Sequence, residues 1–215
     1  MKLFTHKLSP YSAKVRIALA EKGVPFDEVA LPIRRTGILE KPAELLAVNP
    51  RGQVPTLLDG DVRLYDSTVI LEYLEDRYPE PPLYPRPVAA RARARLLEDF
   101  GDWLIGGCVS ELLAETYRKP DPDTRDAARV EAAAGAVAGA YDRLEAELDG
   151  REHLCGAFGA ADIACAVAVT IAAFYGAPPG DGHPRLRAWL GRVSRRPSVV
   201  REVASMSEAL KALAD

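Results

Sequence analysis

The chain has 215 residues and a formal net charge of −3 at pH 7, and at about 100–200 residues per domain this length predicts one large domain or two small ones. Hydrophobic residues make up 48% of the chain and charged residues 27%, which is ample apolar material for a packed core. The slightly acidic balance argues against nucleic acid as the main partner.

The sequence carries no signal for secretion or for a membrane. Its first residues lack both an apolar stretch and a small-residue cleavage site. The longest apolar stretch, from Ile163 to Ala177, is shorter than the roughly 20 residues needed to span a bilayer. The three cysteines form no CxxC pair and the three histidines are scattered, so neither a disulfide framework nor a metal site is indicated. We therefore expect a cytoplasmic protein without a metal or a membrane partner.

The first 80 or so residues alternate between strand and helix patterns in the order β-α-β-α-β-β-α, which predicts a small mixed sheet with helices packed on it. Asp59-Gly60 is a strong hairpin signal between two of the strands. The expected elements are a strand at Lys2–Thr5, a helix at Ser12–Lys22, an extended segment at Phe26–Leu31, a short helix at Lys41–Ala47, strands at Val54–Leu58 and Val62–Leu64, and a helix at Asp66–Arg77.

A proline-rich stretch follows, and residues 80–87 are predicted to be a linker between a first domain at 1–79 and an all-helical domain at 88–215. The helical patterns cover about 88–118, 123–148, 160–175, 184–195 and 198–213. The pattern at 160–175 is apolar all round, which is typical of a buried central helix. Asp162 near its start is interpreted as a structural cap rather than a catalytic carboxylate.

Five stretches in this order resemble the cytosolic glutathione S-transferases, in particular their serine-type zeta-, tau- and theta-like members. The stretches are SPYSAKVRIALAEKG, NPRGQVPTLLDG, LYDSTVILEYLEDRYP, FGAADIACA and HPRLRAWLGRVSRRPSV. The resemblance covers nearly the whole chain and implies a thioredoxin-like N-terminal domain followed by an all-helical C-terminal domain.

Ser9 lies where the first strand gives way to the first helix. On the residues alone, Ser9 is either a simple N-cap or a hydroxyl donor to an anion held at the helix N-terminus. The resemblance implies that Ser9 is the catalytic residue and stabilises the thiolate of bound glutathione. Ser12 then takes the place of a second cysteine found in redox relatives, so the turn lacks the thiols needed for mixed disulfides.

The resemblance also assigns the residues that bind glutathione. It implies a cis bond at Val54-Pro55, which leaves the Val54 backbone free to pair with the cysteinyl part of glutathione by strand addition. Ser67 would hold the γ-glutamyl carboxylate at the positive end of a helix, and Asp66 would face the glutamyl ammonium. The family often has a longer Glu or Gln at the place of Asp66.

The glycyl carboxylate of glutathione needs a cation or amide donors. By resemblance Lys41 and Gln53 lie at the matching places, although Lys41 is equally well explained as a solvated surface lysine. Arg34 and Arg35 are alternative cations.

The resemblance further implies a pocket for a small hydrophobic electrophile, lined by Tyr11, Trp103 and Tyr117. Trp103 and Tyr117 are equally well interpreted as ordinary core or interface aromatics. The family resemblance also implies a homodimer, with contacts that suit residues 88–107.

Together these features predict a glutathione S-transferase that conjugates glutathione to small hydrophobic electrophiles and needs no metal or redox cofactor. One alternative is a glutathione-dependent isomerase of the zeta, or maleylacetoacetate isomerase-like, type. This alternative ranks second, because those enzymes often have a Ser-Ser-Cys-Ser-like turn, whereas this chain has Pro10-Tyr11 in the middle of the turn. The other alternative is a non-catalytic binding or regulatory protein on the same fold, like the stringent-starvation type.

Overall fold

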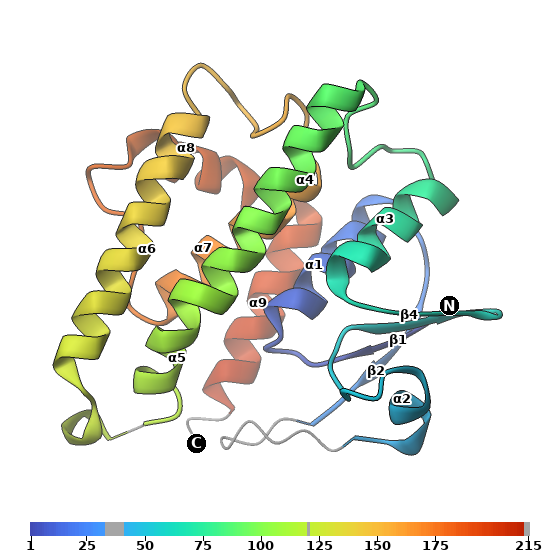
Figure 1. Cartoon of the computed structure of the whole chain (residues 1–215), viewed down its shortest axis with the longest axis horizontal. Coiled ribbons are helices and arrows are strands. Elements are labelled where there is room, and N and C mark those ends of the chain that lie inside the picture. Colours follow the sequence, from blue (N-terminus) through green and yellow to red (C-terminus); the bar gives the residue numbers. More distant parts are fainter. Residues whose placement is uncertain (33–40, 120, 213–215) are drawn as a thin grey trace. The chain divides into compact units, whose positions relative to one another are not determined.

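The computed structural model describes residues 1–32, 41–119 and 121–212. Its contacts divide the chain into two compact units, of which the first comprises Met1–Leu83 together with Pro197–Asp215 and the second comprises Tyr84–Arg196. The predicted fold class is confirmed, because the first unit carries a thioredoxin-like arrangement of strands and helices and the second is helical (Figure 1). The last helix, which the sequence places in the helical domain, packs with the first unit.

Within the described residues, the sheet of the first unit has four strands in the order β2-β1-β3-β4. β1 runs parallel to β2 and antiparallel to β3, and β3 runs antiparallel to β4. The strands are β1 (Lys2–Thr5), β2 (Asp27–Ala30), β3 (Thr56–Asp59) and β4 (Val62–Tyr65). The turn between β3 and β4 contains the predicted Asp59-Gly60 signal, with Gly60 at φ +57°, a conformation that glycine adopts without steric cost.

One row of paired residues marks the end of this sheet that matters for the site. Phe4 pairs with Thr56 across β1 and β3, and Thr56 pairs with Tyr65 across β3 and β4. The chain therefore leaves β1, enters β3 and leaves β4 at the same end of the sheet. The loops at that end are the candidate functional segments.

Four helices belong to the described part of the first unit. They are α1 (Pro10–Glu21), α2 (Ala43–Val48), α3 (Ser67–Arg77) and α9 (Pro197–Lys211). α1 packs against both α3 and α9, and Figure 1 shows α1 and α3 on one side of the sheet with α2 on the other. The core consists of Leu3 and Phe4 of β1, Leu57 of β3 and the apolar face of α1, all of them buried.

The second unit contains α4 (Val88–Trp103), α5 (Ser110–Thr116), α6 (Ala127–Glu147), α7 (Ala160–Phe174) and α8 (Pro184–Val193). The helix predicted at about 88–118 is interrupted by a π-helical segment, Leu104–Val109. This segment contains Gly106 and Gly107, whose low helix propensity makes the regular α-helix easier to break there. None of the helices in the described part of the chain is long and apolar enough to cross a membrane.

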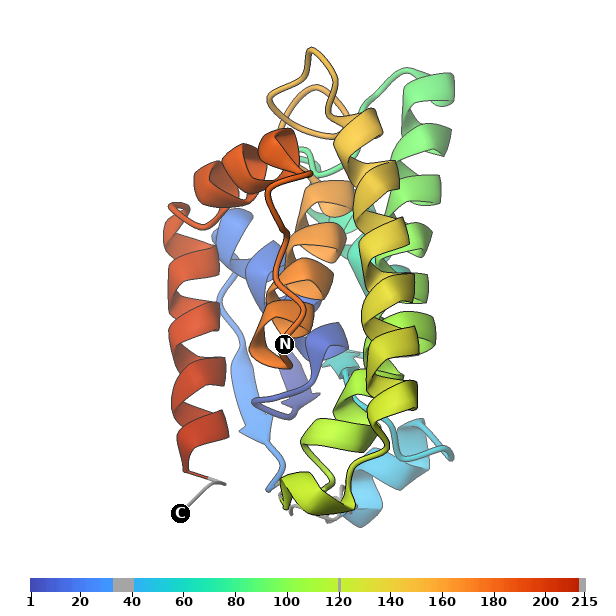
Figure 2. The ribbon, with the colours of Figure 1, turned by 90° about the vertical axis from the view of Figure 1, so that its left-hand side faces the viewer.

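α7 is the central helix of the second unit, as its apolar pattern predicts, and Figure 2 shows it in orange among its neighbours. α4 approaches it closely at Gly101, where an added Cβ would lie 2.8 Å from the carbonyl carbon of Ala164. Asp162 is fully buried and accepts three hydrogen bonds, from Trp189 Nε1 at 2.7 Å, from the Leu154 N–H at 3.1 Å and from the Gly159 N–H at 3.2 Å. These contacts account for Asp162 as a structural residue.

We predict that Asp162→Ala lowers the free energy of unfolding by about 3 kcal/mol or more, since it leaves three buried donors unpaired at about 1–3 kcal/mol each. Asp126 is the matched control, because it caps α6 through the Ala128 and Arg129 N–H groups but is exposed. Asp126→Ala should cost only about 0.5–2 kcal/mol. Urea unfolding of both variants measures the difference, and equal losses would contradict the role given to the buried contacts.

Candidate functional site

Ser9 is the N-cap of α1. Its backbone is extended (φ −77°, ψ 115°), its Oγ accepts the Ser12 N–H at 3.1 Å, and Pro10 takes the first helical position. This explains why α1 starts earlier than the predicted Ser12, because a capping serine and a proline together specify a helix start. The cap uses Ser9 only as an acceptor. A hydroxyl also has one hydrogen to donate, and within the described residues no protein group takes it.

Ser12 follows Ser9 by three residues, lies in the first turn of α1 and is fully buried. Its Oγ has no hydrogen-bond partner among the residues that the structure describes. A buried hydroxyl without a partner costs free energy, so this position requires an explanation. The orphaned hydroxyl lies in the first turn of α1, where backbone N–H groups also point out of the helix.

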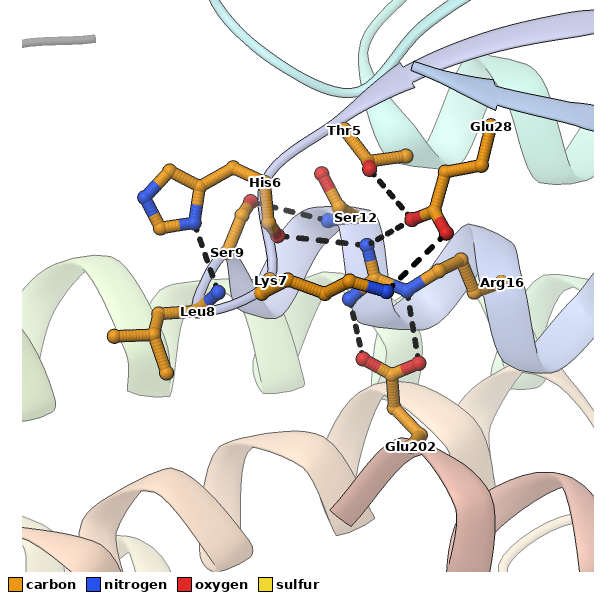
Figure 3. Close-up of polar contacts among 9 residues, drawn as sticks. All are labelled: Thr5, His6, Lys7, Leu8, Ser9, Ser12, Arg16, Glu28 and Glu202. Carbon is orange, nitrogen blue, oxygen red and sulfur yellow. Dashed lines mark hydrogen bonds and ion pairs between the residues drawn. The ribbon is translucent and has the colours of Figure 1, made fainter. Parts of the chain in front are cut away.

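The turn that carries Ser9 is held by His6. The His6 carbonyl accepts the Ser9 N–H at 3.0 Å, and the His6 ring accepts the Leu8 N–H through Nδ1 at 2.8 Å. Figure 3 shows the ring, the turn and the side chains beneath it. An Nδ1 that accepts a hydrogen bond must be unprotonated. Burial lowers the pKa of His6 below its ordinary value of 6.5, and the charge of Arg16 acts in the same direction.

The predicted glutathione loop lies just before β3. The Val54-Pro55 bond is cis, as the resemblance implied. The carbonyl of Gln53 accepts hydrogen bonds from Asn49 Nδ2 and from Thr56 Oγ1, both at 3.0 Å. These two bonds fix the backbone on the entry side of Val54, while the Gln53 side chain is exposed.

Lys41 extends across the turn that precedes Gln53. Its Nζ donates to the Arg51 carbonyl at 3.2 Å, and its side chain lies so close to Gly52 that an added Cβ would meet Lys41 Cδ at 2.5 Å. Gly52 has φ +60°. Lys41 is exposed. Its contact with the glycyl carboxylate stays a prediction. Arg34 and Arg35 lie outside the described residues.

Asp66, rather than Ser67, caps α3. One oxygen of the Asp66 carboxylate, Oδ1, accepts the N–H groups of Thr68 and Val69 at 3.0 and 3.4 Å. Asp66 has φ +77°, the only positive φ outside glycine in the described chain. A non-glycine residue in such a conformation is strained, and strain of this kind gathers at functional sites. Ser67 is the first helical residue and is buried.

Lys14, which the sequence does not single out, lies behind this turn. Lys14 is fully buried on α1, and its Nζ lies 3.3 Å from Thr68 Oγ1 in the first turn of α3. The sequence offered no signal for this role, because the burial of Lys14 depends on a partner from another helix. Its charge adds to the positive end of the α3 dipole.

The register of the sheet brings these segments together. Thr56 stands between Phe4 and Tyr65 in one row across the sheet. The Ser9 turn follows this row in the chain, Val54-Pro55 precedes it, and the Asp66 turn follows it. The N-termini of α1 and α3 therefore lie at one end of the sheet, with an extended backbone segment between them. This arrangement suits an extended ligand that carries a thiol or thiolate and a carboxylate.

The residues predicted to line an electrophile pocket belong to different units. Tyr11 is half-buried in the first turn of α1, in the first unit. In the second unit, Trp103 is 52% exposed and stacks on Phe100, and Tyr117 makes an edge-to-face contact with Tyr175. The pocket remains a prediction. In the described residues no group of three His, Cys, Asp or Glu side chains is placed to hold a metal ion.

Comparison with known proteins identifies the family. Residues 3–82 match the family model of the glutathione S-transferase N-terminal domain, and residues 107–197 match that of the C-terminal domain. A solved glutathione S-transferase from Rhodospirillum rubrum F11 is 32% identical, with a TM-score of 0.82 over 94% of this chain and 90% of that one. The chain belongs to the glutathione S-transferase family.

Curated relatives differ in what their names say. A stringent starvation protein A homolog from Coxiella burnetii is 44% identical over 97 residues, which are 45% of this chain and 44% of the relative. A maleylacetoacetate isomerase from Pseudomonas aeruginosa is 43% identical over 96 residues, 44% of this chain and 45% of the relative. Each match spans a little under half of the relative's length, so the particular activity is a matter for proposal.

The lowered pKa of His6 predicts a pH dependence of stability. The unfolded chain takes up the His6 proton at the ordinary value of 6.5, whereas the folded chain takes it up only at lower pH. Its contribution to stability is therefore full above about pH 6.5 and is lost as the pH falls through the folded-state pKa. We expect the free energy of unfolding to fall between about pH 7 and pH 5 more steeply in the wild type than in His6→Asn.

His6→Asn is a suitable comparison because the asparagine Oδ1 can accept the Leu8 N–H in place of Nδ1 but does not titrate. Urea unfolding of both proteins across this pH range gives the two slopes. Parallel slopes would show that His6 does not titrate as its burial implies.

Proposed function

We propose that this protein is a glutathione S-transferase that stabilises the thiolate of glutathione and conjugates it to small hydrophobic electrophiles. The observation that carries the proposal is the position of Ser9. Its hydroxyl caps α1 as an acceptor, keeps its hydrogen available, and lies at the same end of the sheet as Val54 and Ser67. Membership of the glutathione S-transferase family supports glutathione as the thiol.

The chemistry follows from the anion-stabilising end of α1. A cysteine thiol has a pKa of about 8.5 and is mostly protonated at neutral pH, while only the thiolate is a good nucleophile. A hydrogen bond donated by Ser9 Oγ and the positive end of the α1 dipole both favour the ionised form. The sulfur then attacks an electrophilic carbon, an S–C bond forms, and the displaced electron pair leaves with the leaving group or stays on the acceptor.

The remaining contacts position the tripeptide. The Val54 backbone pairs with the cysteinyl residue, and the N-terminus of α3 receives the γ-glutamyl carboxylate through Ser67, with the buried charge of Lys14 behind it. Asp66 offers the glutamyl ammonium the carboxylate oxygen that is not used for capping. Lys41 or Gln53 meets the glycyl carboxylate.

Two other functions are favoured by particular relatives. The match to a maleylacetoacetate isomerase favours glutathione-dependent isomerisation, and the match to a stringent starvation protein A homolog favours a role without catalysis. Retention on immobilised glutathione distinguishes the conjugating enzyme and the isomerase, which both have to bind glutathione, from the protein without catalysis. A panel of electrophiles that includes an aryl halide and maleylacetoacetate analogues separates conjugation from isomerisation.

The free cysteines and the use of reduced glutathione support a cytoplasmic location.

We predict that Ser9→Ala raises the pKa of the bound thiol and lowers turnover near neutral pH by about tenfold to a hundredfold, since a charge-assisted hydrogen bond is worth about 1.5–3 kcal/mol. The affinity for glutathione should change less, because the contacts of Val54 and Ser67 remain. Raising the pH should restore part of the activity, because the thiol then ionises without help. Steady-state conjugation kinetics across pH measure all three effects.

Ser12→Ala and Tyr11→Phe are the matched controls for this experiment. Ser12→Ala should have a mild effect, because its hydroxyl lies one turn further into α1. If Ser9→Ala were silent and Tyr11→Phe abolished conjugation, the donor to the sulfur would be Tyr11, and the serine-type assignment would fail while the family assignment stood.

We also propose that the protein is a homodimer, as the resemblance implied. The exposed apolar side chains of α4 are offered as contacts along residues 88–107, since Val88 is 85% and Leu96 is 58% exposed and their burial against a partner would be favourable. Sedimentation at micromolar concentration should give a dimer, and Leu96→Glu should weaken it. A wild-type monomer under those conditions would contradict the proposal.

A further inference from the structure

A buried ion pair joins α1 to the last helix of the chain. Arg16 of α1 and Glu202 of α9 have side chains that are only 8% and 7% exposed. The guanidinium binds the carboxylate with two nitrogens, since Nε donates to Oε2 at 2.8 Å and Nη2 donates to Oε1. This fork geometry fixes the plane of the guanidinium as well as its position.

The third nitrogen of Arg16 points at the turn that carries Ser9. Arg16 Nη1 donates to the His6 carbonyl at 3.4 Å and to Glu28 Oε1 at 3.3 Å. That same carbonyl accepts the Ser9 N–H. Figure 3 shows the guanidinium between Glu202 on one side and the His6 carbonyl and Glu28 on the other.

Glu28 connects Arg16 to the end of β1. Its carboxylate accepts from Thr5 Oγ1 at 2.6 Å and lies 3.3 Å from Lys7 Nζ. Burial would raise the pKa of Glu28, but the hydrogen bond from Thr5 and the charges of Arg16 and Lys7 lower it. The backbone on the N-terminal side of Ser9 is thus held at residues 5, 6 and 7, with Arg16 contacting both the loop and the carboxylate that braces it.

α9 is also tied to α1 at a second point, where Ser198 Oγ donates to Glu21. Together with the packing of α9 in the first unit, this places Glu202 in a fixed position relative to α1. A chain of contacts therefore runs from Glu202 through Arg16 and the His6 carbonyl to the Ser9 N–H. The local contacts of His6 with Leu8 and Ser9 are thus supplemented by a contact that comes from the far end of the sequence.

We propose that Arg16 and Glu202 are positioning residues for Ser9, so that the last helix of the chain sets the geometry of the catalytic turn. The part of this inference that concerns catalysis rests on the proposed function. Its physical basis is that the two-nitrogen contact with Glu202 fixes the plane of the guanidinium, and with it the direction in which the third nitrogen meets the His6 carbonyl. A hydroxyl displaced by about 1 Å loses much of its effect on a reacting sulfur, which can cost about a hundredfold in rate.

The test compares Glu202→Gln with Glu75→Gln. Glu75 is a matched control, because it forms a buried ion pair at 2.8 Å with Lys22, the C-cap of α1 at the opposite end of that helix from Ser9, and the side-chain exposures of Lys22 and Glu75 are 0% and 7%. Hydrogen–deuterium exchange of the Leu8 and Ser9 amides is measured without glutathione. Glu202→Gln should accelerate it by about tenfold, as expected for loss of a charge-assisted bond, and Glu75→Gln should not.

Conjugation kinetics form the second arm. Glu202→Gln should lower kcat by about tenfold and shift the pH profile of turnover to higher pH, with the KM for glutathione nearly unchanged, because the loss is one of geometry at the sulfur. Glu75→Gln should leave kcat unchanged. Equal exchange rates at Leu8 and Ser9 in the two variants would overturn the proposal, whatever the kinetics show.

A double variant, Arg16→Met with Glu202→Leu, separates positioning from stability. Apolar residues of similar volume often replace a buried ion pair without loss of stability, so this variant also serves if Glu202→Gln does not fold. The proposal expects wild-type unfolding with rapid exchange at Ser9 and low kcat. If the exchange at Ser9 and kcat were those of the wild type as well, the ion pair would have only a structural role. A silent Ser9→Ala with accelerated exchange in Glu202→Gln would overturn the role of Ser9 in the proposed function and leave the support of the turn intact.

Discussion

The register that places Phe4, Thr56 and Tyr65 side by side across β1, β3 and β4 determines where the candidate site lies. The Ser9 turn, Val54-Pro55 and the Asp66 turn all adjoin that row. A slip of one residue would move a loop by about 3.3 Å and turn every side chain of the strand to the opposite face. The burial of apolar strand residues that forms the core therefore also sets the spacing of the candidate site.

The two helix N-termini at this end are capped differently, and the difference matches what each would bind. Ser9 is an uncharged cap, so the positive end of α1 stays uncompensated and favours a sulfur anion. Asp66 is a charged cap that uses one carboxylate oxygen for the α3 N–H groups, and Lys14 contacts Thr68 in the first turn of the same helix. In the proposed function these two sites would receive the cysteinyl sulfur and the γ-glutamyl end of glutathione.

Buried polar contacts between distant segments organise both units. Arg16 and Glu202 lie 186 residues apart and engage through two hydrogen bonds. In the second unit Asp162 receives three N–H donors, including that of Trp189. Such contacts add little net stability, because desolvation offsets much of the attraction, but they leave only one acceptable arrangement of the helices that carry them. In the first unit that arrangement extends to the turn of Ser9.

The sequence by itself determined the order of strands and helices, the turn at Asp59-Gly60 and the place of Ser9, because alternation, helical period and capping are properties of neighbouring residues. The cis form of Val54-Pro55 came from the family resemblance alone. The sequence did not reveal Lys14 or Arg16, which read as ordinary polar positions on a helix. Their burial depends on Thr68 and Glu202, partners that only the tertiary structure brings to α1. The same holds for α9, whose pattern predicts a helix but whose contacts alone assign it to the first unit.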